Sequence, residues 1–330
     1  MKKYKIAIAD NNGLKFSRDL KEHWEAQGHE VKYERGTSEH LAQWADIYYI
    51  DWADNNLAYL FKLYHESTEV SRPDNWDNNK KPMVVCRIID WEVWTLAMHR
   101  DASMVSWVDK WICIAPHMEK KLREEASFGD SLRLIRPGVA TGRFPLKTAK
   151  TDGFQLGMAL GDMWWPKAHM AGLDIFTQLY RKNNRWKLHI RGQHEGGDYW
   201  PIMYKHYLES RGIEDVVTLY PHVEDMNAWY EQIDILLHPG MKETFCYAVG
   251  EAMAKGIPAV VNEFYGSRDI WVETMLYQTH QEAVDWIDNV NKHRINNQPR
   301  IGWPKLREYI EKEYSLEKQL KETDEWIGIK

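Results

Sequence analysis

The chain has 330 residues, of which 44% are apolar and 28% are charged, and its formal net charge is −6. This composition is typical of a globular protein and excludes a disordered chain. The negative charge argues against a protein whose binding depends on a nucleic-acid backbone. No apolar run reaches the ~18 residues that a membrane-spanning helix needs. Because a domain usually has about 100–200 residues, the length predicts two domains.

The cysteines and the first residues bear on the compartment. Cys86, Cys113 and Cys246 lie far apart in apolar segments, which is typical of free thiols in a reducing compartment. The first ten residues enter a strand-like alternation directly, without the pattern of a signal peptide. We therefore expect a cytoplasmic protein.

The first half of the chain alternates short apolar runs with helical patterns. Such alternation predicts a parallel sheet covered by helices on both faces. We assign residues 1–145 to an N-terminal Rossmann-like domain. Its predicted strands are 4–10, 28–34, 45–51, 82–90, 110–115 and 132–138.

The pattern restarts after the polar stretch 147–153. Residues 146–310 are predicted to form a second Rossmann-like domain. A charged helix over 311–330 follows, for which packing against the first domain is one option. The fold class is thus α/β, with two doubly wound domains facing across a cleft. The predicted strands of the second domain are 154–160, 186–192, 215–220, 233–239 and 257–263.

The stretch HPGMKETFCYAVGEAMAKGIPAVV (238–261) places two glutamates in an apolar context. We predict a turn and then a helix over 245–255, ended by Gly256. Glu243 and Glu251 would be about 12 Å apart, since a helix rises ~1.5 Å per residue. Paired glycosidase carboxylates lie only ~5–9.5 Å apart. The two carboxylates fit better as grips on the hydroxyls of an elongated ligand such as a nucleotide sugar. The plainer alternatives are a helix-dipole partner for Glu243 and a solvent-facing position for Glu251.

The run KETFCYAVGEAMAKGIPAVV resembles the E-x7-E segment of retaining GT-B glycosyltransferases, in particular glycosyltransferase family 4. The segments IRPGVATGRFP (135–145) and YEQIDILLHPG (230–240) are similar to further stretches of that family. The resemblance implies that Glu243 contacts the transferred sugar and Glu251 the ribose of the donor nucleotide. It also implies an Arg and a Lys on the donor diphosphate, in a loop that reads GDMWWPKAHMAG here (161–172).

That loop departs from the family pattern. Lys167 matches the expected Lys, but Asp162 replaces the Arg and Ala168 replaces a Gly. A carboxylate cannot pair with a diphosphate, so we look to Arg191 or Lys242 for the missing positive charge. Asp162 is equally explained as a plain loop cap.

Further candidates follow the other strands, since ligands of open α/β sheets bind outside the carboxyl ends of the strands. Asp90 is a candidate to orient the acceptor, or else an ordinary strand-end aspartate. The predicted catalytic residues are Glu243, Lys167 and Asp90. The predicted donor-binding residues are Glu251, Lys242, Thr244, Phe245, Arg191, Gly13 in the first loop, Tyr220 and Val223 beside the nucleobase, and Gly266, where the amides of 266–267 would cradle phosphate.

We expect no cofactor and no metal. The chain has no D-x-D pair and no His/Cys cluster in sequence, so helix amides and Lys167 would neutralise the leaving group. The expected partners are a nucleotide-diphosphate sugar (UDP or GDP) and a saccharide, lipid-linked or modified-base acceptor. A membrane-surface helix over 116–126 is disfavoured, because its basic residues alternate with glutamates.

Two other functions compete with a retaining hexosyltransferase. A non-catalytic nucleotide-sugar or carbohydrate-binding protein is favoured by the absent Arg at position 162. A phosphorylase or an epimerase with the same fold is disfavoured, because the E-x7-E match indicates transfer and no pyridoxal-binding lysine motif is present.

Overall fold

The structure is a computed structural model that describes residues 2–65, 76–77, 79–90, 92–95, 101–163, 165–193, 199–220, 225–295 and 305–329. The chain divides into two compact units: unit 1 comprises Met1–Gly138 with Glu317–Lys330, and unit 2 comprises Val139–Leu316. The division falls earlier than the predicted boundary after residue 145. The segment 311–316 belongs to unit 2, and the chain returns to unit 1 only from Glu317.

Unit 1 contains a six-stranded parallel sheet in the order β2-β1-β3-β4-β5-β6. Each predicted strand is present with trimmed ends: β1 (Lys5–Ala9), β2 (Glu30–Glu34), β3 (Ile47–Asp51), β4 (Met83–Ile88), β5 (Lys110–Cys113) and β6 (Leu132–Leu134). The helices are α1 (Arg18–Ala26), α2 (Glu39–Trp44), α3 (Asn55–His65), α4 (Glu92–Thr95), α5 (Ala102–Trp107), α6 (Pro116–Glu125) and α13 (Leu316–Ile327). Parallel pairing buries the apolar runs on both faces, as the sequence predicts.

A buried ion pair lies at the carboxyl edge of the unit 1 sheet. The guanidinium of Arg87 donates to both carboxylate oxygens of Asp51, with Nε 2.7 Å from Oδ1 and Nη2 2.8 Å from Oδ2. Arg87 Nη2 also donates to the carbonyl of Phe16 at 2.8 Å. Asp51 of β3 and Arg87 of β4 thus neutralise each other inside the unit, as buried charges require.

Unit 2 contains a second six-stranded parallel sheet, in the order β12-β11-β10-β7-β8-β9. Its strands are β7 (Gln155–Asp162), β8 (Lys187–Gln193), β9 (Val217–Tyr220), β10 (Ile235–His238), β11 (Ala259–Asn262) and β12 (Leu276–Tyr277). Its α-helices are α7 (His169–Lys182), α8 (Tyr199–Arg211), α9 (Met226–Tyr230), α10 (Tyr247–Ala254), α11 (His280–Ile295) and α12 (Leu306–Glu313). The two-residue strand β12 is absent from the sequence-based prediction.

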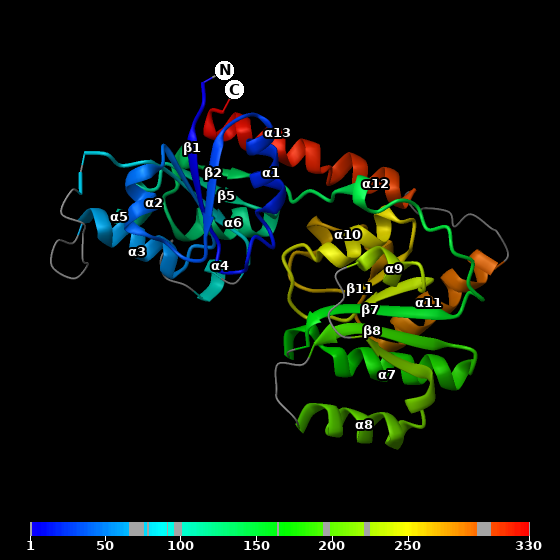
Figure 1. Ribbon diagram of the computed structural model, residues 1–330. Helices are drawn as coiled ribbons and strands as arrows, with labels where there is room; N and C mark the ends of the chain where they lie inside the picture. Colours follow the sequence, from blue (N-terminus) through cyan, green and yellow to red (C-terminus); the bar gives the residue numbers. More distant parts are fainter. Residues whose placement is uncertain are drawn as a thin grey trace. The chain divides into compact units, whose positions relative to one another are not determined.

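Helices α7 and α10 lie on opposite faces of the unit 2 sheet (Figure 1), and α7 packs beside α11. The approach of α7 to the sheet is close, because a Cβ at Gly172 would lie 2.3 Å from Met158 Sδ. This close packing fixes the loop that enters α7 over the carboxyl edge of the sheet.

Two features bear on a membrane contact. No described helix is long and apolar enough to span a bilayer. On α6, Arg123 Nη2 pairs with Glu119 at 2.9 Å, and Lys121 pairs with Glu125. These pairs give α6 the mixed-charge face that the sequence predicts.

Candidate functional site

The candidate site is built on β10, a central strand of unit 2 with all four residues buried. His238 ends the strand, and residues 239–246 then lead into α10, which starts at Tyr247. The predicted start at residue 245 is wrong. Cys246 has the left-handed φ of 66°, which interrupts the helical path. Glu243 therefore lies in the loop, and the helical rise assumed between Glu243 and Glu251 does not apply over its first part.

Glu243 and Lys167 form an ion pair. Lys167 Nζ lies 2.5 Å from Glu243 Oε1, and the two side chains are 25% and 12% exposed. Lys167 ends a short 3₁₀ turn, Trp165–Lys167, between β7 and α7. The amide of Met241 donates to the carbonyl of Pro166 at 2.9 Å and joins the two loops. The structure thus brings together two residues that the sequence assigned to one site.

His238 and Cys246 adjoin this pair. Cys246 Sγ lies 3.4 Å from His238 Nδ1, and His238 Nε2 lies 3.5 Å from Glu243 Oε1. One ligand atom from each of these three residues lies within 4.8 Å of the others. The spacing of these residues in the sequence shows no His/Cys cluster. The fold nevertheless brings them together, because β10 and the turn into α10 fold back on one another.

The protonation states of this cluster follow from burial. Burial, assisted by the positive charge of Lys167, lowers the pKa of His238 to about 3. Burial, followed by the charge of Glu243, raises the pKa of Cys246 to about 12. The imidazole is therefore neutral and the thiol keeps its proton at neutral pH. A metal ion here would have to displace that proton, since the thiolate is the ligating form.

Glu251 projects from α10 and meets Tyr230 of α9. Tyr230 Oη lies 2.9 Å from Glu251 Oε2 and 3.1 Å from the Ala248 carbonyl. Burial, followed by the charge of Glu251, raises the pKa of Tyr230 well above its ordinary value, and Arg191 on β8 opposes this. Arg191 and Glu251 thus act on the same buried hydroxyl, which places the predicted arginine in the electrostatic environment of the second glutamate.

Other predicted residues of the motif lie among packed side chains. Phe245 is 2% exposed, and its ring contacts the rings of Trp271, Tyr247 and Tyr314. Its side chain therefore belongs to an aromatic cluster. Thr244 is buried beside it at 7% exposure, and Lys242 lies in the preceding loop.

The β7–α7 loop, where the sequence departs from the family pattern, has an unusual backbone conformation. Asp162 is the last residue of β7. Ala168, the residue before α7, has a φ of 48°, in the left-handed region that glycine favours. The family glycine that the sequence lacks would thus suit the backbone at this position.

Some of the remaining predicted residues of unit 2 take part in local hydrogen bonds. Gly266 has a φ of 87°, and the amide of Ser267 donates to the Phe264 carbonyl at 3.0 Å. That bond engages one of the two amides of the predicted cradle at 266–267. Tyr220 Oη donates to Gln232 Oε1 at 2.9 Å and lies 2.9 Å from His189 Nδ1. Val223 lies outside the described residues.

Two predicted residues belong to unit 1. Gly13 follows β1 with a φ of 72°, and a Cβ there would lie 3.3 Å from Arg35 Nη2. Asp90 follows β4, and its amide donates to Glu92 Oε2 at 3.0 Å. The sequence did not single out Glu92, and it missed His238, Cys246 and Tyr230 in unit 2.

Comparisons with known proteins agree with this arrangement. Residues 155–292 match the family described as "Glycosyl transferases group 1". A GDP-mannose-dependent alpha-mannosyltransferase of Mycolicibacterium smegmatis is 46% identical over 43 residues, which are 13% of this chain and 12% of that protein. The matched segment is thus a small part of the curated relative.

Two solved structures extend the likeness to the whole fold. A glycosyltransferase from Rickettsia africae has a TM-score of 0.75 at 12% identity, covering 100% of this chain and 99% of that one. Anabaena HepE in complex with UDP-glucose has a TM-score of 0.71 at 13% identity, covering 98% and 99%. The chain therefore has the GT-B fold, and its residues 155–292 match the glycosyl transferases of group 1 and resemble those of family 4.

Proposed function

We propose that this chain is a glycosyltransferase that moves a hexose from a UDP- or GDP-sugar to a hydroxyl acceptor, with retention of the anomeric configuration and without a metal ion. The Lys167–Glu243 pair supports the proposal most directly. It lies at the carboxyl edge of a parallel sheet, where open α/β folds bind ligands, and inside the segment that matches the family.

Lys167 and Glu243 supply complementary chemistry. An ammonium beside the donor diphosphate offsets the charge that develops as the sugar leaves. A carboxylate accepts hydrogen bonds from two sugar hydroxyls. The 2.5 Å distance from Lys167 Nζ to Glu243 Oε1 supports their contact with adjacent points of one ligand.

Glu251 is proposed to accept the ribose hydroxyls. Tyr230 holds one of its oxygens from the buried side, at 2.9 Å, which orients the carboxylate. Arg191 and Lys242 are proposed to supply the positive charge that position 162 lacks. The donors named for similar proteins, GDP-mannose and UDP-glucose, share the diphosphate and ribose that these residues would bind.

The proposed transfer takes place on one face of the sugar. The bond between the anomeric carbon and the donor phosphate oxygen breaks, and a bond from that carbon to the acceptor oxygen forms. The acceptor hydroxyl proton passes to the departing phosphate. Asp90 of unit 1 is proposed to orient the acceptor, which is a saccharide, a lipid-linked saccharide or a modified base. A cytoplasmic location is part of the proposal, since nucleotide sugars are made there.

The first test is a thermal-shift screen of UDP- and GDP-hexoses, with and without EDTA. A donor at 100 times its Kd adds about 2.7 kcal/mol of stability, which gives a clear shift. We expect one donor to stabilise the protein equally in EDTA. If no nucleotide sugar does so, or if the donors bind but no acceptor yields nucleotide release above background, the enzyme proposal is wrong.

Two variants test the division of roles. Glu243→Ala should abolish transfer with a modest loss of nucleotide affinity, whereas Glu251→Ala should weaken binding of UDP or GDP itself. Isothermal titration with the free nucleotide and a transfer assay separate the two effects. Equal, small effects from both variants would contradict the assignment.

A further inference from the structure

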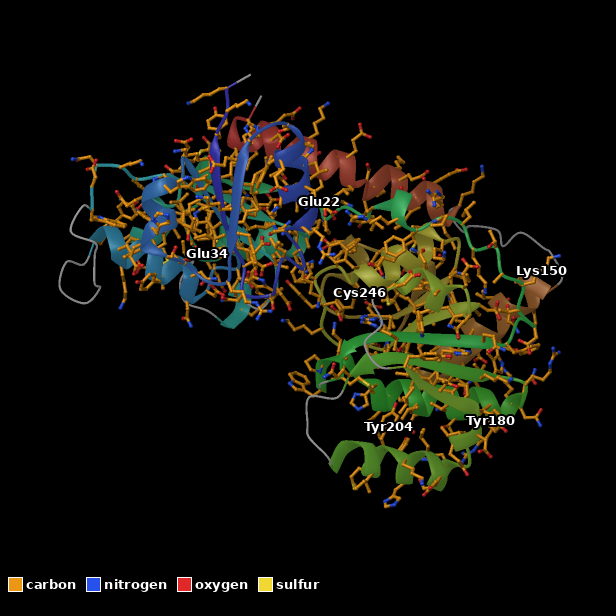
Figure 2. The ribbon with its side chains drawn as sticks, viewed as in Figure 1. Glu22, Glu34, Lys150, Tyr180, Tyr204 and Cys246 are labelled. Carbon is orange, nitrogen blue, oxygen red and sulfur yellow. The ribbon has the colours of Figure 1, made fainter. Side chains whose placement is uncertain are left out.

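Cys246 adopts a backbone conformation that its side chain disfavours. It occupies the turn into α10, where Figure 2 labels it, with φ 66° and ψ 84°. Glycine adopts such a conformation freely, whereas a side chain strains it. Strained residues of this kind persist where another interaction holds them, and they gather at functional sites. The thiol is the part of Cys246 that glycine would lack.

The thiol has one evident hydrogen-bond acceptor. Sγ lies 3.4 Å from His238 Nδ1, and the His238 side chain is 2% exposed. With a neutral imidazole and a protonated thiol, the favoured pairing is S–H to the lone pair of Nδ1, because nitrogen is a stronger acceptor than sulfur. A neutral imidazole carries one ring proton, so that proton lies on Nε2.

The protonated nitrogen then faces the candidate catalytic carboxylate. His238 Nε2 is buried and makes no hydrogen bond to any described residue, and Glu243 Oε1 lies 3.5 Å from it, just beyond hydrogen-bond distance. The residue between them is glycine: a Cβ at Gly240 would lie 2.8 Å from Nε2 and 3.3 Å from Oε1. Gly240 therefore permits the approach of imidazole and carboxylate, and a shift of a few tenths of an ångström would complete the bond.

We propose that Cys246 and His238 are positioning residues, with the thiol fixing the imidazole tautomer so that Nε2–H holds the carboxylate of Glu243. The inference rests on the proposed roles of Lys167 and Glu243. When Lys167 turns to the donor diphosphate, Glu243 loses its cationic partner. His238 then keeps the carboxylate in place for the sugar hydroxyls, and Cys246 keeps the required proton on Nε2.

The first test reads the tautomer directly and needs no donor. In ¹⁵N-labelled protein, long-range ¹H–¹⁵N spectra distinguish protonated from bare imidazole nitrogens. We expect His238 to carry its proton on Nε2 at pH 7 in the wild type and in Cys246→Ser, whose hydroxyl also donates. In Cys246→Ala, a second tautomer should appear. A proton on Nδ1 in the wild type, or an unchanged spectrum in Cys246→Ala, overturns the proposal.

The second test measures nucleotide release from GDP-mannose and UDP-glucose. Without the thiol, the Nε2–H of His238 is no longer held toward the Glu243 carboxylate. Losing this hydrogen bond to a charged group should lower kcat about tenfold in Cys246→Ala and Cys246→Gly, with KM changed less than about threefold. Cys246→Ser should recover most of kcat. The glycine variant relieves the backbone strain, and a thermal melt of each variant separates a loss of rate from a loss of folded protein. Cys86→Ala, which removes a buried thiol from β4 of unit 1, is the matched control and should keep the wild-type rate.

The outcomes separate the two proposals. A wild type that releases no nucleotide while His238 shows the Nε2–H tautomer contradicts the proposed function alone. A wild type that turns over while Cys246→Ala equals it contradicts the positioning role alone. Stoichiometric zinc in purified protein, lost in Cys246→Ala, would make the three residues a metal site and overturn the positioning role.

Discussion

Glu92 is a buried carboxyl group at the carboxyl edge of the unit 1 sheet. It is 0% exposed, and its oxygens accept hydrogen bonds from the amides of Ile89 at 2.7 Å and Asp90 at 3.0 Å. Burial raises the pKa of Glu92 to about 7, and these amide bonds oppose the shift. Glu92 thus shapes the loop that carries Asp90, the residue proposed to orient the acceptor.

Glu92 should make stability depend on pH. Its pKa in the folded protein, about 7, exceeds the ordinary 4.5, so the folded state binds the proton more tightly. The resulting stabilisation is complete below about pH 4.5 and is lost as the pH rises to about 7. Between pH 5 and pH 8 we expect Glu92 to contribute a loss on the order of 1–3 kcal/mol to the free energy of unfolding, measured by urea titration.

The variant Glu92→Gln isolates this contribution. The buried histidines His29 and His238 have lowered pKa values and act in the opposite direction, since the unfolded state binds their protons more tightly. The wild type should therefore lose more stability than Glu92→Gln over the same pH range. Parallel pH profiles of the two proteins would contradict the assignment.

The sequence reveals some residues of the site and conceals others. Glu243 and Glu251 are visible because carboxylates stand out in an apolar motif, and Lys167 is visible through its match to the family loop. His238 and Tyr230 are not, since a histidine ending an apolar strand and a tyrosine in a short helix look like core residues. Their partners become evident only when β10, α9 and α10 are placed together in space.

At the scale of elements, both α7 and α10 begin after a non-glycine residue with positive φ, Ala168 and Cys246. These residues turn the chain sharply from the sheet edge into a helix and thereby position Lys167 and Glu243 beside them. A sequence gives no direct sign of a left-handed alanine or cysteine. That is why the strand positions are predictable from apolar runs, whereas the start of α10 is not.

Ala168→Gly should stabilise the protein. Glycine adopts the left-handed conformation without the Cβ strain, and the gain should exceed its greater entropy in the unfolded chain by on the order of 0.5–1 kcal/mol. Urea unfolding followed by circular dichroism measures the difference. A loss of stability in Ala168→Gly would show that the methyl group makes a contact that outweighs the strain.

Gly172→Ala should have the opposite effect. The added Cβ would lie 2.3 Å from Met158 Sδ and 3.2 Å from Pro239 Cγ, so α7 must move away from the sheet. We expect a loss of about 1–3 kcal/mol, typical of overpacking. The matched control is Gly142→Ala, whose added methyl group has nothing within 4 Å and should change stability little. Gly212→Ala is unsuitable as a control because Gly212 has a φ of 65°, which strains an alanine. Equal stabilities of the Gly172 and Gly142 variants would show that α7 relaxes freely.

At the scale of the whole molecule, the chain returns to its first unit at the end. In α13, Asp324 lies 2.8 Å from Trp24 Nε1 and 2.7 Å from His23 Nε2, both on α1, and 2.8 Å from Nε2 of Gln27, the residue that caps α1. Asp324 is 8% exposed, so this contact between residues some 300 positions apart is shielded from water. The sequence shows a charged helix here but not its partner, because the same pattern suits any amphipathic surface helix.

Asp324→Ala should destabilise unit 1. Removing the carboxylate leaves the buried indole N–H and the other α1 donors without an acceptor, at a cost of about 2–4 kcal/mol. Lys321→Ala, at a side chain that is 76% exposed on the same helix, is the matched control and should change little. Thermal unfolding compares the two, and an Asp324→Ala variant as stable as Lys321→Ala would mean that α13 is not held through this carboxylate.

The fold of both units could be predicted from the sequence, since repeated apolar strands and helical patterns allow few architectures. The sugar, the acceptor and the hydrogen-bonded surroundings of the glutamates could not, because they depend on side chains that converge only in three dimensions.

The central claim is that this chain transfers a sugar by means of Glu243. The direct measurement offers a panel of UDP- and GDP-hexoses with mixed hydroxyl acceptors and determines the product linkage by NMR, for the wild type and for Glu243→Ala. We predict one glycoside whose anomeric configuration matches the donor, formed in EDTA by the wild type and reduced at least about 100-fold in Glu243→Ala. An inverted product, or equal transfer by the two proteins, would contradict the account.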